Sequence, residues 1–329
     1  MTRVAENSLA RKILDDVRQT RAAVSKFSEQ VSSGYKVTVP SDSDVAGSIA
    51  TFRDSLRRLD GYRTRVATVQ TTLTLQDDIL RQVDELLTRA RELATQAASE
   101  PNSPTTRASM ANEVFAIRDQ VVTLANSRDS SGYIFGGADN DDPPYDLTTN
   151  YSSGTGSAAI RYAFDNEVGT DIQRTTKVTD DISITVNTPA DQLFDTALYG
   201  LDRLGRSLAG LTTPVDGSGV PSGAGATYSF PTDIGVQTAD IRAALDQIIS
   251  AHDNALMPER VSLGARLSRL EAAESILQLN KTNAEDLLGK LQNIDSVEAI
   301  SNLTLAQSAL EASLQVTVKT LRQSILDYL

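Results

Sequence analysis

The chain contains no cysteine and no tryptophan, and its 329 residues include a single histidine, His252. Without cysteine there is no disulfide framework, no thiol nucleophile and no zinc–thiolate site. One histidine argues against most catalytic triads and dyads. It also argues against the paired Glu-x-x-His motifs of di-metal bundles, since the residue three before His252 is Ile249. The composition therefore disfavours most enzymes that depend on histidine or cysteine.

Three remaining features that resemble chemical motifs have simpler explanations. His252 lies in a helical stretch beside Asp253, which is typical of an ordinary surface histidine. The acidic run at 139–142 lacks the glycine and the later glutamate of an EF-hand loop, so it predicts an acidic turn. The Gly-Ser-Gly at 217–219 has no strand before it and no helix after it, so it predicts a linker and not a phosphate loop. We expect no catalytic residue, no metal site and no cofactor.

Long apolar runs are also missing. The first 16 residues have no continuous apolar segment of the kind that forms a secretory signal. The longest uncharged stretches are polar and rich in glycine, so we expect no membrane-spanning segment. Any export of this chain must use a route that does not read a cleavable signal.

Negative charge is unevenly placed along the chain. The formal net charge is −12, and residues 129–240 contain 16 acidic and 5 basic residues, so nearly all of the excess lies in the middle third. An acidic, solvated middle argues against nucleic acid as a partner. Its simplest interpretation is a surface that keeps the protein soluble.

The first part of the chain predicts a helix from about residue 5 to residue 32 with one narrow apolar seam. Its 3-4 spacing is typical of a coiled coil, and such a helix needs a partner to cover the seam. The positions of this seam are Ala10, Ile13, Val17, Thr20, Val24, Phe27 and Val31.

Two more helices are predicted next, and they should form a hairpin. A helix over 43–98 would be about 80 Å long and has heptad spacing. Gln76 is the one polar residue of its seam, and it either fixes the register or is a tolerated, partly solvated position. A turn with Pro101 and Pro104 leads to a third helix around 110–124. A short loop between two heptad helices predicts an antiparallel pair.

The connection between the first two helices predicts a change of direction. Gly34 and Gly47 would supply backbone freedom, and Pro40 with Ser41 and Asp42 would start the next helix. The alternative is an ordinary loop without any assembly contact.

The middle of the chain predicts a compact, β-rich domain. Ten of the sixteen aromatic residues lie within 133–230, and aromatic residues provide the most apolar area for a core. Apolar side chains at 133–135, 160–164 and 182–186 predict strands. A helix over 193–211 and a Gly/Ser-rich linker follow.

Helical periodicity returns at about Val236, and Pro258 should kink or restart the helix. The final helix should open at Asp295, with Glu298 completing a capping box, and continue to the last residue. Its apolar seam, which also includes Gln307, comprises Ile300, Leu303, Leu310, Leu314, Val318, Leu321, Ile325 and Tyr328.

We therefore predict a mainly α fold with a β-rich insert. The N- and C-terminal segments should form a long antiparallel, coiled-coil-like helical rod, and the mid-chain should form a smaller α+β domain. We expect the terminal helices to lie side by side, with the β-rich part at the far end of the rod. The expected segments are an N-terminal assembly helix and loop (1–42), a helical hairpin of the rod (43–130), a β-rich variable domain with one helix and a linker (131–235), a return helix (236–293) and a C-terminal assembly helix (294–329).

Two assembly interfaces follow from the terminal seams. If each seam were covered within one chain, the protein would be an inert rod, whereas seams shared between copies would make it a subunit of a polymer. The C-terminal interface is the seam of the final helix, and the N-terminal interface comprises Ile13, Val17, Val24, Phe27 and Val31.

Several segments, in the expected order, resemble the bacterial flagellin family and its hook-associated relatives. They are VSSGYKVTVPSDSDVAGSIA (31–50), SGYIFGG (131–137) followed by DNDDPPY, SLGARLSRLE (262–271) and IDSVEAISNLTLAQSALEASLQV (294–316). The ending SILDYL is nearer to that of the junction proteins between hook and filament than to that of flagellins. The resemblance covers roughly 5–137 and 236–329. One departure is Ser43-Asp44, at the entry to the second predicted helix, where relatives often have Asp-Pro.

This resemblance implies a structural subunit of the bacterial flagellum that joins hook to filament and is not an enzyme. It implies export, unfolded, through the flagellar type III apparatus to a place outside the cell, and terminal helices that become ordered on assembly. The implied partners are other copies in a ring, a hook-side hook-associated protein and flagellin, with an export chaperone as a further candidate. The alternatives are flagellin itself and, from another class, a cytosolic coiled-coil scaffold.

Overall fold

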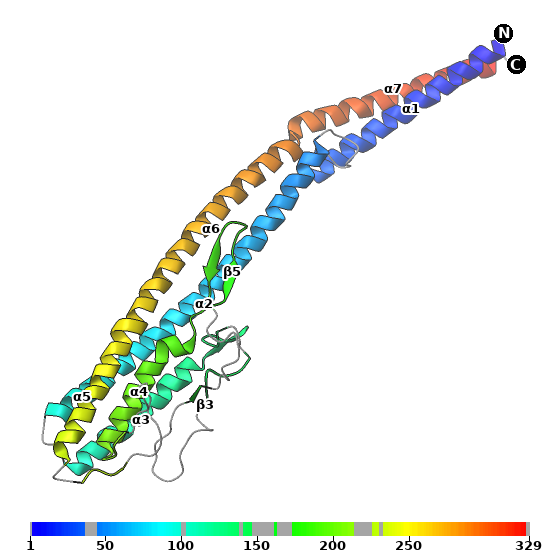
Figure 1. The fold of residues 1–329 in the computed structure, drawn as a ribbon. Coiled ribbons are helices and arrows are strands. Elements are labelled where there is room, and N and C mark those ends of the chain that lie inside the picture. Colours follow the sequence, from blue (N-terminus) through cyan, green and yellow to red (C-terminus); the bar gives the residue numbers. More distant parts are fainter. Residues whose placement is uncertain are drawn as a thin grey trace. The chain divides into compact units, whose positions relative to one another are not determined.

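The fold was determined as a computed structural model, which describes residues 2–36, 45–99, 103–137, 141–146, 161–162, 173–213, 226–229 and 233–326 (Figure 1). Side chains of residues 2–10, 13, 146, 161–162 and 320–326 are outside this description. In chain order the elements are α1 (Thr2–Ser33), α2 (Ala46–Ser99), α3 (Pro104–Ala125), β1 (Arg128–Asp129), β2 (Gly132–Tyr133), β3 (Tyr145–Asp146), β4 (Arg161–Tyr162), β5 (Thr175–Lys177), β6 (Ser183–Thr185), α4 (Ala190–Leu208), α5 (Ile234–Ala251), the π-helical turn η2 (His252–Leu256), α6 (Met257–Gln292) and α7 (Ser296–Leu326).

The chain forms two units, and their boundaries fall inside α2 and α6. Unit 1 comprises residues 1–61 and 276–329, and unit 2 comprises residues 62–275. The mainly helical class with a small strand-containing middle, predicted from periodicity, is confirmed. The five segments expected from the sequence follow other boundaries, since the two units divide at 61/62 and 275/276, inside the segments 43–130 and 236–293.

Unit 2 contains the helical hairpin, because the heptad seams of α2 and α3 are buried there. Arg89 on α2 pairs with Glu113 on α3 at 2.7 Å, and Thr72 donates to Asp129 just after α3 at 3.3 Å, so the two helices run antiparallel. Ser103 caps α3 by accepting a hydrogen bond from the backbone N–H of Thr106 at 3.1 Å. The buried seam residues of the two helices are Val66, Val69, Leu73, Leu80, Val83, Leu87, Met110, Val114, Ile117 and Val121.

Helix α4 completes the core of unit 2 by packing against α3 and α5. Glycines allow this close approach, because a Cβ on Gly205 would lie 2.5 Å from the Phe115 ring of α3. On the other side, a Cβ on Gly200 would lie 2.9 Å from Ile248 of α5. Phe194 meets Phe135 edge to face, with ring centroids 5.1 Å apart.

The strands are short and form three two-stranded antiparallel sheets in the described residues: β1–β2, β3–β4 and β5–β6. In β5–β6, Thr176 is opposite Ile184, whose side chain is buried, as the predicted alternation at 182–186 requires. Of the predicted strand at 133–135, only Tyr133 lies in a strand, and Ile134 and Phe135 form a turn. The backbone N–H of Ile134 still donates to the Ser127 carbonyl at 3.0 Å.

The expectation that the β-rich part lies at the far end of the rod is wrong. The side-chain amide of Gln76 donates to the carbonyl of Val186 at 2.6 Å, so β6 ends beside the middle of α2. Helix α2 continues to Ser99, beyond this contact. The hairpin β5–β6 therefore lies along the side of the helices (Figure 1).

The hydrogen bond to Val186 explains why a polar residue, Gln76, occupies the apolar seam of α2. Its side chain is only 1% exposed, so it is not a wet position in the seam. Its amide donates to the carbonyl just after β6, so this buried polar side chain is hydrogen-bonded.

The return helix restarts at Pro258, as predicted, through a π-helical turn. Proline cannot donate a backbone hydrogen bond, and η2 (His252–Leu256) widens the helix immediately before it. His252 is not an ordinary surface residue, because its ring lies 2.9 Å from Asp84 on α2 and 2.6 Å from Asp253. Arg260 also reaches α2, at Asp77, 3.2 Å away. These pairs show that α6 runs antiparallel to α2 in unit 2.

In unit 1, α1 and α7 pack together along their lengths, as predicted (Figure 1). Asp295 caps α7, because its carboxylate accepts from the backbone N–H groups of Val297 at 2.9 Å and Glu298 at 3.3 Å. Lys281 on α6 pairs with Asp60 on α2 at 2.7 Å, so the antiparallel pairing of α2 and α6 is also present in this unit.

Candidate assembly surface

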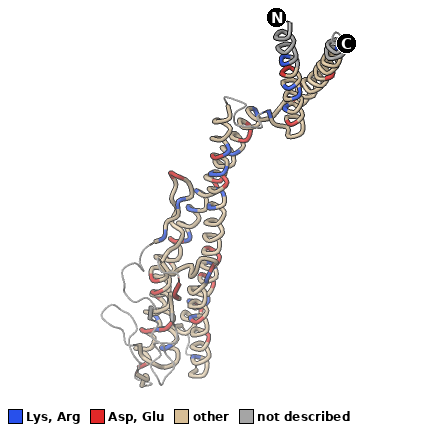
Figure 2. The backbone as a smooth tube through the Cα atoms, turned by 90° about the vertical axis from the view of Figure 1, so that its right-hand side faces the viewer, with Lys and Arg blue, Asp and Glu red and all other residues tan. Residues whose placement is uncertain are grey.

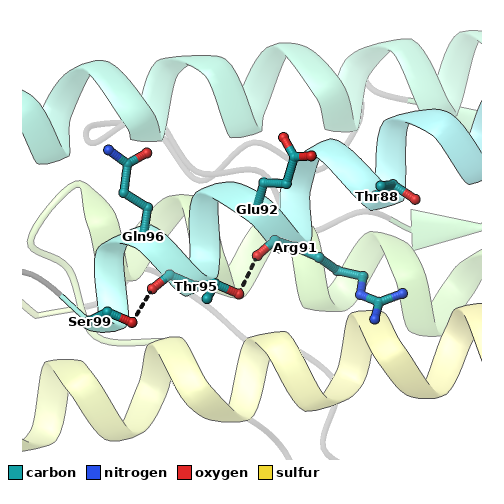
Figure 3. Close-up of a pocket in the computed structure, with 6 residues that line it drawn as sticks. All are labelled: Thr88, Arg91, Glu92, Thr95, Gln96 and Ser99. Carbon is teal, nitrogen blue, oxygen red and sulfur yellow. Dashed lines mark hydrogen bonds between the residues drawn. The ribbon is translucent and has the colours of Figure 1, made fainter.

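A pocket lies on a single face of α2 and is lined by polar side chains (Figure 3). Thr95 donates to the Arg91 carbonyl and Ser99 to the Thr95 carbonyl, so both hydroxyls are bonded to their own helix. No group of three or more His, Asp or Glu side chains in the described residues is placed to hold a metal ion. None of the helices described is both long and apolar enough to cross a membrane.

The predicted N-terminal interface faces α7 but is only partly covered by it. Val17, Val24, Phe27 and Val31 are half-buried, while the side chain of Ile13 lies outside the described residues. Gln30, which the heptad analysis missed, is the most buried described residue of α1, with 9% exposed. The opposite side of α1 is polar and charged, as expected for a helix with one apolar face.

The predicted C-terminal interface divides into two parts. Leu303 and Leu310 are half-buried against α1, whereas Ile300, Leu314 and Val318 are 54%, 47% and 54% exposed. The side chains of Leu321 and Ile325, and the whole of Tyr328, lie outside the described residues.

The centre of the face of α7 that packs on α1 was missed from the sequence. It is formed by Ala299 and Ala306, which are each 7% exposed. A seven-residue repeat of alanine gave a signal, but larger neighbours on the same helix dominated the pattern.

Helix α7 exposes further large apolar residues outside the predicted seam. Val297, Leu305 and Val316 are also exposed, by 79%, 65% and 57%. Its charged residues with described side chains are Glu298, Glu311 and Lys319, whereas α1 has charges of both signs along its length (Figure 2). Several large apolar residues exposed on one helix mark a surface for which other helices would provide cover.

Unit 1 provides little of this cover. Its buried apolar residues in the described part are Ile49, Leu277, Ala284, Ala299 and Ala306, and only two of these are large. Burial of one Leu or Val contributes ~1.5–3 kcal/mol, whereas fixing one residue costs about 1–2 kcal/mol of conformational entropy. The terminal helices therefore have apolar area available for a partner.

The predicted direction-change loop is only partly described. Gly34 ends α1 with φ of 75°, a left-handed conformation that glycine adopts without strain. Gly47 instead lies inside the first turn of α2, so the structure does not use its freedom at the turn. Pro40, Ser41 and Asp42 lie outside the described residues.

The residues after Gly34 join the end of α1 to the start of α7. The backbone N–H of Lys36 donates to the Gln292 carbonyl at 2.6 Å, and that of Ile294 donates to the Gly34 carbonyl at 3.1 Å. The side chain of Gln30 donates to the Lys36 carbonyl at 2.6 Å. These bonds fix the two terminal helices to each other at one end.

Comparison with known proteins matches the two ends of the chain to two regions of one protein family. Residues 4–137 match the bacterial flagellin N-terminal helical region, and residues 245–329 match the bacterial flagellin C-terminal helical region. Together these regions cover most of the chain.

Full-length relatives carry hook-associated names. The chain is 27% identical over 314 residues to flagellar hook-associated protein 3 of Salmonella typhimurium, covering 94% of each chain. It is 27% identical over 301 residues to the protein of that name from Escherichia coli, covering 90% of each. Among solved structures, a putative flagellar hook-associated protein from Vibrio parahaemolyticus has a TM-score of 0.61 at 16% identity, covering 77% of this chain and 100% of that one, which shows a shared fold.

Proposed function

The chain belongs to the bacterial flagellin family, and we propose that it is the structural subunit that joins the flagellar hook to the filament. The observation that carries this proposal is its similarity, over nearly the full length, to proteins named flagellar hook-associated protein 3. The matches of both chain ends to the bacterial flagellin family support a structural role in the flagellum.

The mechanism is burial of the terminal helices between neighbouring copies. The exposed side chains of Ile300, Leu314 and Val318 would become covered on association, together with the half-buried seam of α1. Each such residue contributes ~1.5–3 kcal/mol on burial, so association stabilises the ends only when several copies contribute. Assembly should therefore be cooperative.

The partners follow from the position of such a subunit. It would contact other copies in a ring, a hook-associated protein on the hook side and flagellin on the filament side. It would act outside the cell, after export through the flagellar type III apparatus, and an export chaperone would protect the apolar α7 before secretion.

Electron microscopy of a strain that lacks this chain tests the proposal. We expect hooks without filaments and filament protein shed into the medium. Restoration by Ala22→Asp, on the side of α1 away from α7, but not by Phe27→Asp, on the side facing it, would locate the function on the seam. Filaments that remain attached without the chain would contradict the proposal. Hooks without filaments, and with no filament protein in the medium, would identify the chain as flagellin instead.

A further inference from the structure

Tyr145 joins the β3–β4 pair to the helices of unit 2. It is the first residue of β3 and pairs with Tyr162 of β4. Asn126, which ends α3, holds the backbone of Tyr145 with two hydrogen bonds. Its side-chain amide donates to the Tyr145 carbonyl at 2.7 Å, and the Tyr145 N–H donates to its side-chain oxygen at 3.0 Å. With only 2% of its surface exposed, Tyr145 is docked in the core of unit 2.

The hydroxyl of Tyr145 contacts a carboxyl group of α4. It lies 2.7 Å from one oxygen of Asp195, to which it donates, and 3.2 Å from the carbonyl of Ala190. Tyr199 donates to the other oxygen of Asp195 at 3.3 Å. Burial raises the pKa of Tyr145 well above its ordinary value, so its hydroxyl keeps its proton at neutral pH. Because Tyr145 is buried against Asp195, water reaches this face of the carboxyl group only when Tyr145 moves away.

A second carboxylate, Asp191, lies one turn before Asp195 on the same face of α4. One of its oxygens is buried and accepts no hydrogen bond from the residues that the structure describes. Burial, together with the charge of Asp191, raises the pKa of Asp195 from 3.8 to about 7. A proton on Asp195 removes the repulsion between the two carboxylates and places a donor on a face of α4 that lacks one.

The other charged groups on the elements packed around α4 have ion-pair partners of their own. These pairs are Arg118 with Asp202, Arg203 with Asp240, and His252 with Asp84. The pair on α3 and α4 lies about two turns along α4 from Asp195. In the described part of the chain, none of these groups is hydrogen-bonded to Asp195. The contact with Tyr145 therefore depends on the proton of Asp195 itself.

We propose that Asp195 and Tyr145 form a proton-dependent lock that holds the β3–β4 pair on the helices of unit 2. With Asp195 protonated, the buried contact between the two side chains is uncharged, and Tyr145 stays docked. Ionisation of Asp195 leaves a charge where little water reaches it, and undocking of Tyr145 hydrates that charge. The Asn126 bonds to the backbone of Tyr145 break in the same step. This inference concerns the middle of the chain and does not depend on the proposed function.

The lock should open as pH rises. The docked carboxyl group of Asp195 has a pKa of about 7, and the hydrated group returns towards 3.8. Between these two values the docked state holds a proton that the undocked state releases. Each pH unit in this range therefore shifts the equilibrium towards the undocked state by up to about tenfold. Below and above the range the equilibrium should not change with pH.

Hydrogen exchange of the natural chain tests the lock, because Asn126 protects the amide of Tyr145 only in the docked state. Mass spectrometry of overlapping peptides that differ by Tyr145 isolates this amide, and each rate is divided by the intrinsic rate at the same pH. We expect the corrected rate to rise at least about tenfold between pH 5 and pH 7 and to level off above pH 7.

Comparison with α3 shows whether the opening is local. Unfolding of the whole unit also releases the proton of Asp195, so amides in the middle of α3 report that larger event. The amide of Tyr145 should exchange at least about tenfold faster than these at pH 7, since undocking leaves the buried seams of the helices intact. Equal corrected rates at every pH would overturn the lock, because β3 would then open only when the whole unit unfolds.

Two matched variants assign the effect to Asp195. Asp195→Asn keeps the shape of the side chain but has no proton to lose, so the rise between pH 5 and pH 7 should disappear. Asp142→Asn removes an exposed carboxylate from the segment before β3 and should keep the rise. The same rise in Asp195→Asn, or a flat profile in the natural chain, would overturn the lock.

A third variant keeps the test decisive if Asp195→Asn does not fold. Asp191→Asn removes the neighbouring charge that raises the pKa of Asp195, so the corrected exchange rate of Tyr145 should level off at a lower pH. A profile identical to that of the natural chain would show that these two carboxylates do not control the contact and would overturn the lock.

Discussion

Asp202 is a buried carboxylate held between two buried arginines of unit 2. It accepts a hydrogen bond from Arg118 at 2.8 Å, and its other oxygen lies 2.7 Å from Arg206, whose side chain has no exposed surface. Burial raises the pKa of Asp202, and both guanidinium groups oppose this rise. Asp119, which is half exposed, also pairs with Arg118 at 2.9 Å.

Removing this carboxylate should destabilise unit 2 strongly. Asp202→Ala leaves two buried positive charges without their shared partner, and we expect a loss of about 3–5 kcal/mol in the free energy of unfolding. Asp119→Ala is the control and should cost about 1 kcal/mol or less, because its ion pair is partly solvated. Urea denaturation followed by circular dichroism measures both, and equal losses would contradict this account.

Asp195 should make stability depend on pH near neutrality. Burial, with the charge of Asp191, raises the pKa of Asp195 from 3.8 to about 7, although hydrogen bonds from Tyr145 and Tyr199 favour its ionised form. Between those two values the folded state holds a proton that the unfolded state releases, so stability falls as pH rises from about 4 to about 7.

The variant Asp195→Asn isolates this effect. It should be more stable than the natural chain at pH 8, by on the order of 2 kcal/mol, and should lose that advantage by pH 4. The difference in unfolding free energy between the two proteins, measured at both pH values, cancels contributions from other groups. A difference that does not change with pH would show that folding does not raise the pKa of Asp195.

At the scale of elements, the position of α4 depends on two glycines as well as on its packed side chains. Gly205 and Gly200 let α3 and α5 approach it from two sides, at Phe115 and Ile248. Glycine in a helix costs roughly 0.5–1 kcal/mol relative to alanine, so its presence at both contacts indicates that close packing outweighs this cost.

Alanine substitution should therefore have opposite effects at two helical glycines of unit 2. Gly205→Ala forces its Cβ against the Phe115 ring and should destabilise by about 1–3 kcal/mol. Gly264→Ala, where nothing lies within 4 Å, should stabilise by roughly 0.5–1 kcal/mol. Thermal unfolding by circular dichroism gives the sign of each change. Stabilisation by Gly205→Ala would show that the Phe115 ring of α3 can move aside at little cost.

For the whole molecule, stability should differ between the two units. The large buried apolar residues lie mostly in unit 2, while α1 and α7 leave many apolar side chains exposed. In the soluble chain, amide hydrogens of α1 and α7 should exchange at least about tenfold faster than those of α3 and α4, because few contacts oppose local opening. Hydrogen exchange with mass spectrometry measures this, and equal protection in both units would remove the basis for coupled folding and assembly.

The sequence by itself determined the helices, because apolar periodicity, Asp295 at a helix start and Pro258 at a restart act within a few residues. It also indicated that both chain ends carry apolar seams. Only the tertiary structure decided that the Gln76 amide meets Val186, 110 residues away, and that Asp202 lies between Arg118 and Arg206. It alone decided that Ala299 and Ala306 face α1 while Ile300, Leu314 and Val318 stay exposed. Periodicity marks an apolar helix face, but which part of a face is covered depends on how closely a distant segment can approach, and small side chains set that distance.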